Sequence, residues 1–166
     1  MNPAKMSVRT SLLAMGALLL LDQLPKIWVR ANIPMHHTMD LIPYLIDLTH
    51  VENKGVSFSM LGGLPDSVRV PILVGISVAA VGVLAYYWIR FRHRMNAFTH
   101  FGFVLILAGA SGNLIDRAVF GTVTDFFHFR FIETSFFVNN VADILISLGV
   151  ICYLIGVLRK GPERAY

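Results

Sequence analysis

The chain has 166 residues, of which 55% are hydrophobic and 14% charged, and its formal net charge is +4 at pH 7. Soluble domains carry about 25% charged residues, so this composition, with a mean hydropathy of +0.65, indicates a membrane protein and excludes a disordered chain. The length allows one domain, which we take as residues 1–166, and the single cysteine, Cys152, cannot form an intrachain disulfide.

Four apolar segments are long enough to cross a bilayer, which takes about 20 helical residues. They lie at about residues 11–29, 70–89, 97–115 and 136–158. A cleavable signal peptide is the alternative for the first, but no small-x-small cleavage site follows it, and residues 27–29 continue the apolar pattern. In the second segment, Gly75, Ala79 and Gly82 have a spacing that suits close helix packing. We therefore expect four transmembrane helices.

The distribution of basic residues predicts the orientation of these helices, because Lys and Arg gather on the cytoplasmic side of membrane proteins. Eight of the 14 basic residues, with one acidic residue, Glu163, fall in the two termini and in the loop between the second and third segments. The other basic residues and nine acidic residues lie toward the opposite side. Both termini are therefore expected in the cytoplasm. Topology then explains the basic pI, so no nucleic-acid partner is expected.

The two outer connections, about residues 30–69 and 116–135, are long enough to fold. Residues 45–52 are rich in Val, Ile and Thr, and residues 127–131 alternate with period two, so both patterns favour strands. Residues 62–69 contain the Gly and Pro that are typical of a turn. The sequence thus predicts a mainly α-helical membrane protein with a small extracytoplasmic β platform.

Polar residues inside the expected helices gather at their outer ends. A charge at bilayer depth costs at least about 2.5–3.5 kcal/mol, which makes such groups candidates for function. The fourth segment carries a stripe of Asn139, Asn140, Asp143 and Ser147, and the third carries Gly109, Gly112, Asn113, Asp116 and Arg117. On the first segment, Asp22 and Lys26 are four residues apart and can form an ion pair, which would fix the depth of the helix.

Asp125 lies in the second outer connection, eighteen residues before Asp143, and aromatic residues follow it. If this loop folds back over the fourth helix, the two carboxyl groups meet and share a proton, because both cannot ionise cheaply. One carboxylate would then activate a water while the other, protonated, polarises a carbonyl, which is the chemistry of aspartic proteases. The spacing alone leaves open whether the two residues meet.

Other chemistries have weaker support in the sequence. The six histidines lack the HExxH spacing of zinc peptidases, so no metal is expected. A serine–lysine hydrolase would need a desolvated Lys54 beside Ser57 or Ser59, but these lie in an expected outer loop. Cys152 is deep in the fourth segment, where its thiol stays protonated and inert. A channel or transporter would need polar groups through the full depth of the membrane.

Five short motifs occur in order along the chain. They are Asp22-Gln23-Leu24-Pro25-Lys26, Asn53-Lys54-Gly55-Val56-Ser57-Phe58-Ser59, Gly112-Asn113-Leu114-Ile115-Asp116-Arg117, Gly121-Thr122-Val123-Thr124-Asp125-Phe126 and Asn140-Val141-Ala142-Asp143. Together they resemble the successive motif blocks of bacterial lipoprotein signal peptidase, or signal peptidase II, over about residues 10–158.

The resemblance implies an aspartic endopeptidase of the bacterial inner membrane, without metal or cofactor. Such enzymes remove the signal peptide of prolipoproteins just before a cysteine that already carries diacylglycerol. Asp125 and Asp143 match the family's catalytic pair. The supporting positions that match are Asn113, Arg117 and Asn140 around the pair, and Asp22, Lys26, Asn53 and Gly55 in architecture or substrate-loop support. The implied partners are diacylglyceryl prolipoproteins, membrane lipid and globomycin-type inhibitors, and the outer loops would form a β cradle and a mobile helix over the cleft.

This sequence departs from the family pattern at four positions, Pro25, Lys54, Ala108 and Asn139. They suggest one alternative, a non-proteolytic paralogue that binds lipoprotein precursors or inhibitor. Both aspartates are present, however, and this favours the peptidase. We expect the departures at Lys54 and Asn139 to alter the charge and polarity of the cleft.

Overall fold

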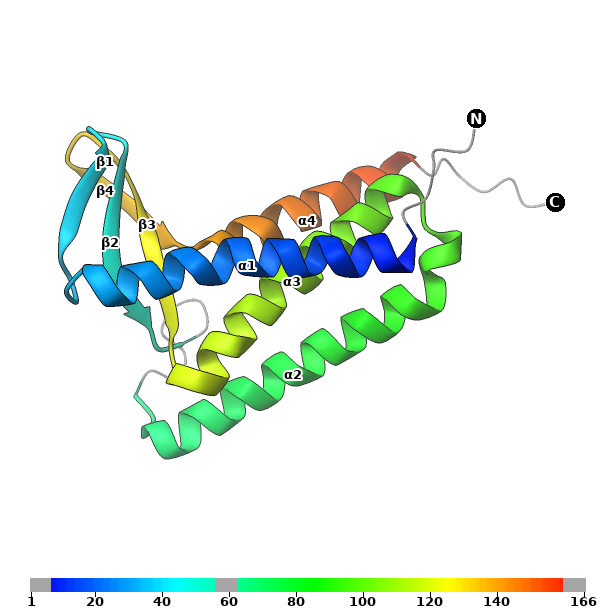
Figure 1. Cartoon of the computed structure of the whole chain (residues 1–166), viewed down its shortest axis with the longest axis horizontal. Helices are drawn as coiled ribbons and strands as arrows, with labels where there is room; N and C mark the ends of the chain where they lie inside the picture. Colours follow the sequence, from blue (N-terminus) through cyan, green and yellow to red (C-terminus); the bar gives the residue numbers. More distant parts are fainter. Residues whose placement is uncertain (1–6, 56–62, 160–166) are drawn as a thin grey trace.

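The computed structural model describes residues 7–55 and 63–159. In chain order its elements are α1 (Val8–Asn32), β1 (Thr38–Ile42), β2 (Ile46–Asn53), α2 (Asp66–Phe91), the short 3₁₀ helix η2 (Arg92–Arg94), α3 (Ala97–Phe120), β3 (Val123–Phe131), β4 (Thr134–Asn139) and α4 (Val141–Arg159). The long helices run beside one another, and the sheet lies across one end of the bundle (Figure 1). The predicted fold class, transmembrane helices with a small β platform, is confirmed.

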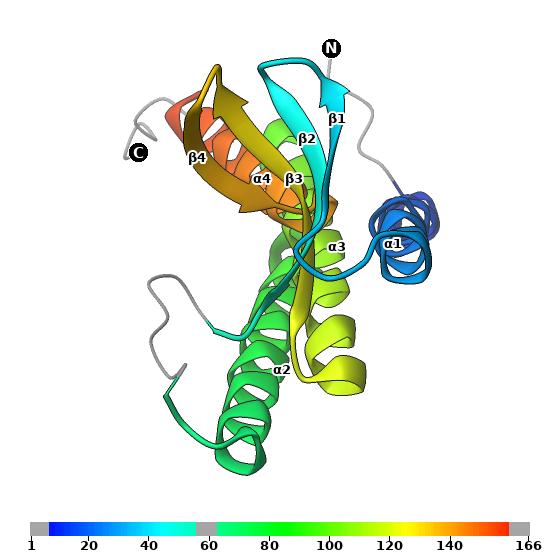
Figure 2. The same ribbon diagram turned by 90° about the vertical axis from the view of Figure 1, so that its left-hand side faces the viewer.

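Within the described residues, four helices are long and apolar enough to span a bilayer, so the chain is a multi-pass membrane protein. α3 is the central helix, because α1, α2 and α4 each pack against it (Figure 2). Most of α3 is buried, whereas the apolar residues of the other three helices are mostly exposed, as surfaces that face lipid should be. The structure thus centres the protein core on α3.

α3 and α4 approach each other closely because glycine lies at their contact. A Cβ on Gly102 would come within 2.7 Å of the carbonyl oxygen of Gly149, and a Cβ on Gly149 would come within 2.6 Å of Ile106. Such close backbone contact is how membrane helices pack without a hydrophobic driving force. This contact holds α4, and with it Asp143, against α3.

The small residues of α2 behave differently from the prediction. Among the described residues, no atom lies within 4 Å of a Cβ built on Gly75 or Gly82, so the expected helix contact at this stripe is wrong. α2 instead packs on α3 through bulky residues, with Trp88 buried against Phe103 and Leu107. Large side chains on the facing side supply the dispersion contacts, and the small stripe is left facing outward.

Among the helix boundaries that differ from those expected are the start of α2, the end of α3 and the start of α4. α2 begins at Asp66, inside the predicted turn at 62–69. α3 runs to Phe120, beyond the expected end at 115, and Gly121 ends it with φ 74°, a left-handed conformation that glycine adopts at low cost. α4 begins at Val141 rather than at 136, because the preceding residues form β4 and pair with β3.

The sheet has strand order β1-β2-β3-β4, with all neighbours antiparallel, and its two faces differ in polarity. Cross-strand pairs on one face are apolar: Met39 with Leu48, Leu48 with Phe127, Ile46 with Phe129 and Phe129 with Phe137. On the other face, buried Asp47 accepts hydrogen bonds from Arg130 (2.9 Å) and His128 (3.1 Å), and His128 also contacts Ser135 (2.8 Å). Burial acts to raise the pKa of Asp47, but these hydrogen bonds outweigh it and the pKa is lowered. The ionised carboxylate therefore fastens β2 to β3.

The start of α1, the end of α4 and the connection from α2 to α3 lie together at the end opposite the sheet (Figure 1). Arg90, Arg92 and Arg94 belong to this connection. The basic loop and the outermost described residues of both terminal helices thus share one side, as the charge distribution predicts.

Candidate active site

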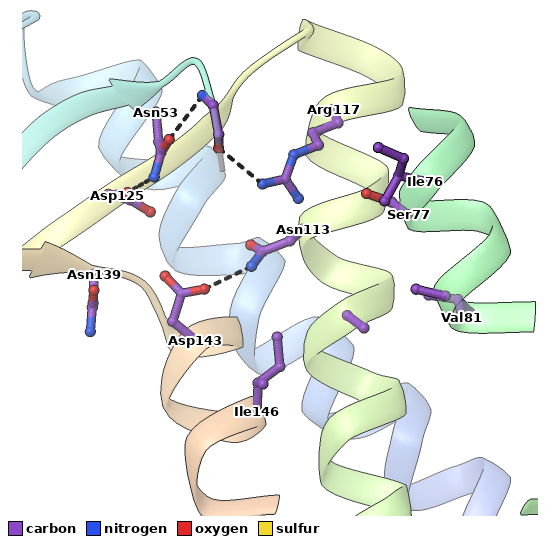
Figure 3. A pocket seen from close by; sticks show the side chains of 13 residues that line it. Asn53, Ile76, Ser77, Val81, Asn113, Arg117, Asp125, Asn139, Asp143 and Ile146 are labelled. Carbon is purple, nitrogen blue, oxygen red and sulfur yellow. Dashed lines mark hydrogen bonds between the residues drawn. The ribbon is translucent and has the colours of Figure 1, made fainter. Parts of the chain in front are cut away.

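A cavity of about 560 Å³ lies where the helices meet the sheet (Figure 3). Asp125 from β3 and Asp143 from α4 both line it. The other lining residues are Asn53, Gly55, Ile76, Ser77, Ala80, Val81, Ala110, Asn113, Arg117, Asn139 and Ile146. Two carboxyl groups that lie eighteen residues apart in sequence therefore line one partly open cavity.

Asp125 is held at both carboxyl oxygens. Asn53 donates a hydrogen bond to one oxygen (3.0 Å) and Asn140 donates to the other (2.5 Å). The side chain is 3% exposed, and burial, reinforced by the nearby charge of Asp143, raises the pKa of Asp125 from 3.8 to about 6. The two amide donors and the Lys26 charge favour the ionised form and limit this rise. Asp125 is therefore placed to exchange a proton close to neutral pH.

Asn140 connects the two aspartates through a single side chain. Its carbonyl oxygen accepts the backbone N–H of Asp143 (3.0 Å), which is how asparagine caps the start of a helix. Its NH₂ group donates to Asp125, as described above. On the opposite side, Asn113 donates to the Asp143 carboxylate (2.8 Å). The start of α4 and the position of Asp125 are thus fixed by one residue.

A cluster of four charged residues, three of them fully buried and one partly exposed, lies behind the cavity between α1 and α3. We call Asp22, Lys26, Arg30 and Asp116 the charged cluster. The Lys26 ammonium donates to Asp22 (2.8 Å), contacts Asp116 (2.9 Å) and donates to the carbonyl oxygen of Asn113 (3.1 Å). An ammonium has three N–H donors, so all three are used. The third bond turns the NH₂ group of Asn113 toward Asp143.

Asp22 also holds the first turn of α4. Its second carboxylate oxygen accepts the backbone N–H of Ala142 (2.8 Å), and Asp22 is fully buried. A carboxylate at a helix N-terminus pairs with unsatisfied N–H groups and with the positive end of the helix dipole. The expected Asp22–Lys26 ion pair is confirmed, and its carboxylate also holds the start of α4.

Asn53 and Gly55 form one wall of the cavity where β2 ends. The side-chain oxygen of Asn53 accepts the N–H of Gly55 (3.1 Å), and Arg117 reaches the carbonyl oxygen of Gly55 (3.4 Å). Buried Arg69 donates to the carbonyl oxygen of Lys54. The mobile helix over the cleft is expected in the outer connections without exact bounds, and residues 56–62 of the first connection lie outside the described residues. Within the described part, the Lys54 side chain is exposed and does not line the cavity.

The structure sorts the predicted site residues into two layers. Lining the cavity are Asp125, Asp143, Asn113, Arg117, Asn53 and Gly55. Asn140, Asp22 and Lys26 are buried behind it. Sequence reasoning did not identify Arg30, although it continues the four-residue spacing of Asp22 and Lys26 along α1. Within residues 7–55 and 63–159, no group of three His, Cys, Asp or Glu side chains is placed to hold a metal ion.

Fold and cavity together define a polytopic membrane protein with two carboxyl groups in a cavity at one end of its helix bundle (Figure 1). The sequence profile of the family described as "Signal peptidase (SPase) II" matches residues 14–159. The lipoprotein signal peptidase of Allorhizobium ampelinum is 41% identical over 133 residues, covering 80% of this chain and 78% of the relative. That of Syntrophus aciditrophicus is 31% identical over 154 residues, covering 93% and 95%.

A solved structure of a bacterial membrane enzyme, obtained by the in meso method at 1.9 Å resolution, has the same fold. It superposes with a TM-score of 0.80 at 26% identity, covering 97% of this chain and 99% of the other. The chain therefore belongs to the signal peptidase II family, and its reaction is the removal of the signal peptide from prolipoproteins.

Proposed function

We propose that the chain is an aspartic endopeptidase in which Asp125 and Asp143 form the catalytic dyad. The observation that carries this proposal is the cavity itself, which both carboxyl groups line. Behind it, Asn140 bonds both the Asp125 carboxyl group and the backbone N–H of Asp143. Burial, reinforced by the nearby charge of Asp143, raises the pKa of Asp125 to about 6, so Asp125 can carry the proton that a dyad needs. A dyad in this state contains both a general base and a general acid.

The surrounding hydrogen bonds divide these roles between the two residues. Asp125, with its pKa at about 6, retains a proton nearest to neutral pH and polarises the scissile carbonyl. Asp143, held by Asn113, is the base that accepts a proton from the attacking water. The proton on Asp125 then passes to the leaving amine. Arg117, whose charge acts on both aspartates, orients the peptide carbonyl from α3.

The composition of the cavity wall supports a lipid-modified substrate. Asn53, Asn139 and Arg117 provide a polar end beside the dyad, whereas Ile76 and Ile146 provide an apolar wall from α2 and α4. A peptide bond placed at the polar end leaves an apolar signal helix and acyl chains against the apolar wall and membrane lipid. The substrate is accordingly a diacylglyceryl prolipoprotein, cut just before the lipidated cysteine. Globomycin-type inhibitors would compete for the same space.

The same proposal places the chain in the bacterial inner membrane with both termini in the cytoplasm. The basic loop at Arg90–Arg94 shares its side with the outermost described residues of α1 and α4, and the cavity lies at the other end. The dyad then faces the outer side, where a translocated prolipoprotein presents its cleavage site.

The test is cleavage of a diacylglyceryl prolipoprotein by purified variants in detergent or nanodiscs. Asp125→Asn and Asp143→Asn should each abolish turnover, and the double variant should be hardly worse, because a dyad acts as a unit. Asp40→Asn is the matched control, since it makes the same change on an exposed residue of the same sheet. Substantial turnover by either single dyad variant would rule out this mechanism.

A further inference from the structure

We infer that Arg30 is a positioning residue for the reaction, which holds Asp125 in place through the hydroxyl of Thr124. The inference rests on the proposed dyad and deepens it. Through Asp116, the same arginine is tied to the chain of contacts that orients Asp143. Arg30 does not line the cavity, so its effect on catalysis must pass through other side chains.

The first observation is the way in which Arg30 uses its guanidinium. Its Nε donates to the hydroxyl of Thr124 (2.7 Å) and one terminal nitrogen donates to Asp116 (2.8 Å). The charged carbon also lies 3.9 Å from the centre of the Phe120 ring. A planar fork with fixed donor directions can satisfy two acceptors on two elements at once, which a lysine ammonium cannot do in the same geometry.

Thr124 matters as an acceptor because it precedes Asp125 on β3. Successive side chains of a strand point to opposite faces, so Thr124 faces Arg30 while Asp125 faces the cavity. Thr124 is 1% exposed, and its backbone N–H also points at Asp116 (3.4 Å). The contacts that hold Thr124 on the face opposite the cavity therefore fix the rotation of β3 about its axis, and with it the direction of the Asp125 side chain.

The second observation is that Asp116 serves both aspartates. One of its oxygens binds Arg30 (2.8 Å) and the other binds Lys26 (2.9 Å). Lys26 in turn orients Asn113, which donates to Asp143. Asp116 is fully buried, so neither contact is weakened by water. Asp116 thus links two sets of contacts: one runs through Arg30 and Thr124 toward Asp125, and the other runs through Lys26 and Asn113 to Asp143.

The charged cluster contains two acidic and two basic residues and is therefore neutral as a whole. Ionisable groups at membrane depth are tolerated where they pair with one another in this way. A role in fold stability alone would explain the cluster as well, so the experiment must separate positioning from stability.

The decisive variant is Thr124→Val, which keeps the branched shape and removes the acceptor of the Arg30 Nε bond. We expect kcat on a diacylglyceryl prolipoprotein to fall by about tenfold or more with KM little changed, since small displacements of catalytic groups are costly. Thr124→Ser keeps the hydroxyl and should restore most of the rate. Thr122→Val is the matched control, because Thr122 is buried nearby and its hydroxyl makes no hydrogen bond within the described residues.

The pH profile provides a readout that a purely structural role would not move. Rotation of β3 weakens the bonds from Asn53 and Asn140 that favour ionised Asp125. The basic limb of the kcat profile, where Asp125 loses the proton it supplies, should therefore move to higher pH in Thr124→Val. The charged groups that act on Asp125, namely Asp143, Lys26 and Arg117, are unchanged in this variant.

Arg30→Lys completes a double-mutant cycle and guards against misfolding of one variant. If Arg30 acts through Thr124, Arg30→Lys should lower kcat in the wild type but have little further effect in Thr124→Val. Wild-type kcat and pH profile in a folded Thr124→Val, or additive effects in the cycle, would overturn the inference. Activity in Asp125→Asn would instead overturn the dyad, so the two failures are distinguishable.

Discussion

The carboxylate of Asp125 should cost the protein stability at the pH where it works. Asp125→Asn replaces the buried group by a neutral amide of nearly the same shape, so it should abolish cleavage and stabilise the fold at neutral pH. The physical reason is the burial of this side chain, which raises its pKa above the ordinary value. Burial makes the ionised form of Asp125 unfavourable, so the proposed catalytic role of this residue comes at the expense of the stability of the fold.

The magnitude follows from the two pKa values. A carboxyl group with a pKa of about 6 in the folded chain and 3.8 in the unfolded chain costs about 3 kcal/mol of stability above pH 6, at about 1.36 kcal/mol per pH unit. Because the folded pKa is the higher one, the folded state binds the proton more tightly. The penalty is therefore absent below about pH 4, grows between pH 4 and 6, and is complete at pH 7. This value is an upper bound, since the amide that replaces the carboxylate in Asp125→Asn would face two amide donors.

The assay is thermal or denaturant unfolding in detergent at pH 4 and at pH 7, for wild type and variant. Asp125→Asn should match the wild type at pH 4 and unfold at higher temperature at pH 7. Asp47→Asn provides the matched control, because Asp47 is also a buried sheet aspartate but has a lowered pKa. Its ionised form is stabilising above the unfolded pKa, so Asp47→Asn should lose stability at pH 7 and progressively less as the pH falls.

Two results would refute this reasoning. One is a loss of stability at pH 7 in Asp125→Asn, which would mean that the hydrogen bonds from Asn53 and Asn140 outweigh the cost of burial. The other is a stability gain of equal size at pH 4 and pH 7, since an effect without pH dependence cannot come from ionisation.

Three further predictions concern the cap, the reagents and the helix contact. Asn140→Ala should lower the free energy of unfolding by about 1 kcal/mol and reduce turnover. Asn140→Ser should restore the helix cap but not the turnover, because serine is too short to reach Asp125. Equal recovery of stability and turnover in Asn140→Ser would contradict the linking role of Asn140. Cleavage should survive EDTA and serine- or thiol-directed reagents, and loss on chelation with recovery on adding zinc would point to the histidines. Gly149→Ala should lower the unfolding temperature because its Cβ would meet Ile106, whereas Gly75→Ala, with open space around it, should not; a similar loss in both would contradict the packing argument.

The transmembrane helices and the Asp22–Lys26 pair could be predicted from sequence because both depend on local patterns. Apolar length defines a membrane span, and a four-residue separation places two side chains on one helix face. The boundary at residues 136–140 could not be predicted in the same way. Three apolar residues in a row, Phe136 to Val138, suit either a helix or a strand, and only pairing with β3 decides between them.

The meeting of the site residues depends on contacts that span the chain. Asn53 reaches Asp125 because β2 and β3 pair in a register that sets Val51 opposite Asp125. No spacing in the sequence encodes this register, so motif resemblance selected Asn53 where periodicity did not. Arg30 illustrates the converse, since its spacing from Lys26 was visible but its acceptor, Thr124, is ninety-four residues away.

The charged cluster has a consequence for biogenesis, because its members enter the membrane at different times. α1 carries Asp22, Lys26 and Arg30 and is the first described helix to be synthesised, whereas Asp116 arrives with α3. Until then, α1 holds one uncompensated positive charge, and the free oxygen of Asp22 has no N–H to bind until α4 supplies Ala142. Asp116 therefore neutralises α1 when α3 inserts, and only afterwards does α4 supply the Ala142 N–H for Asp22 together with Asp143, so the proposed dyad is the last part of the fold to be assembled.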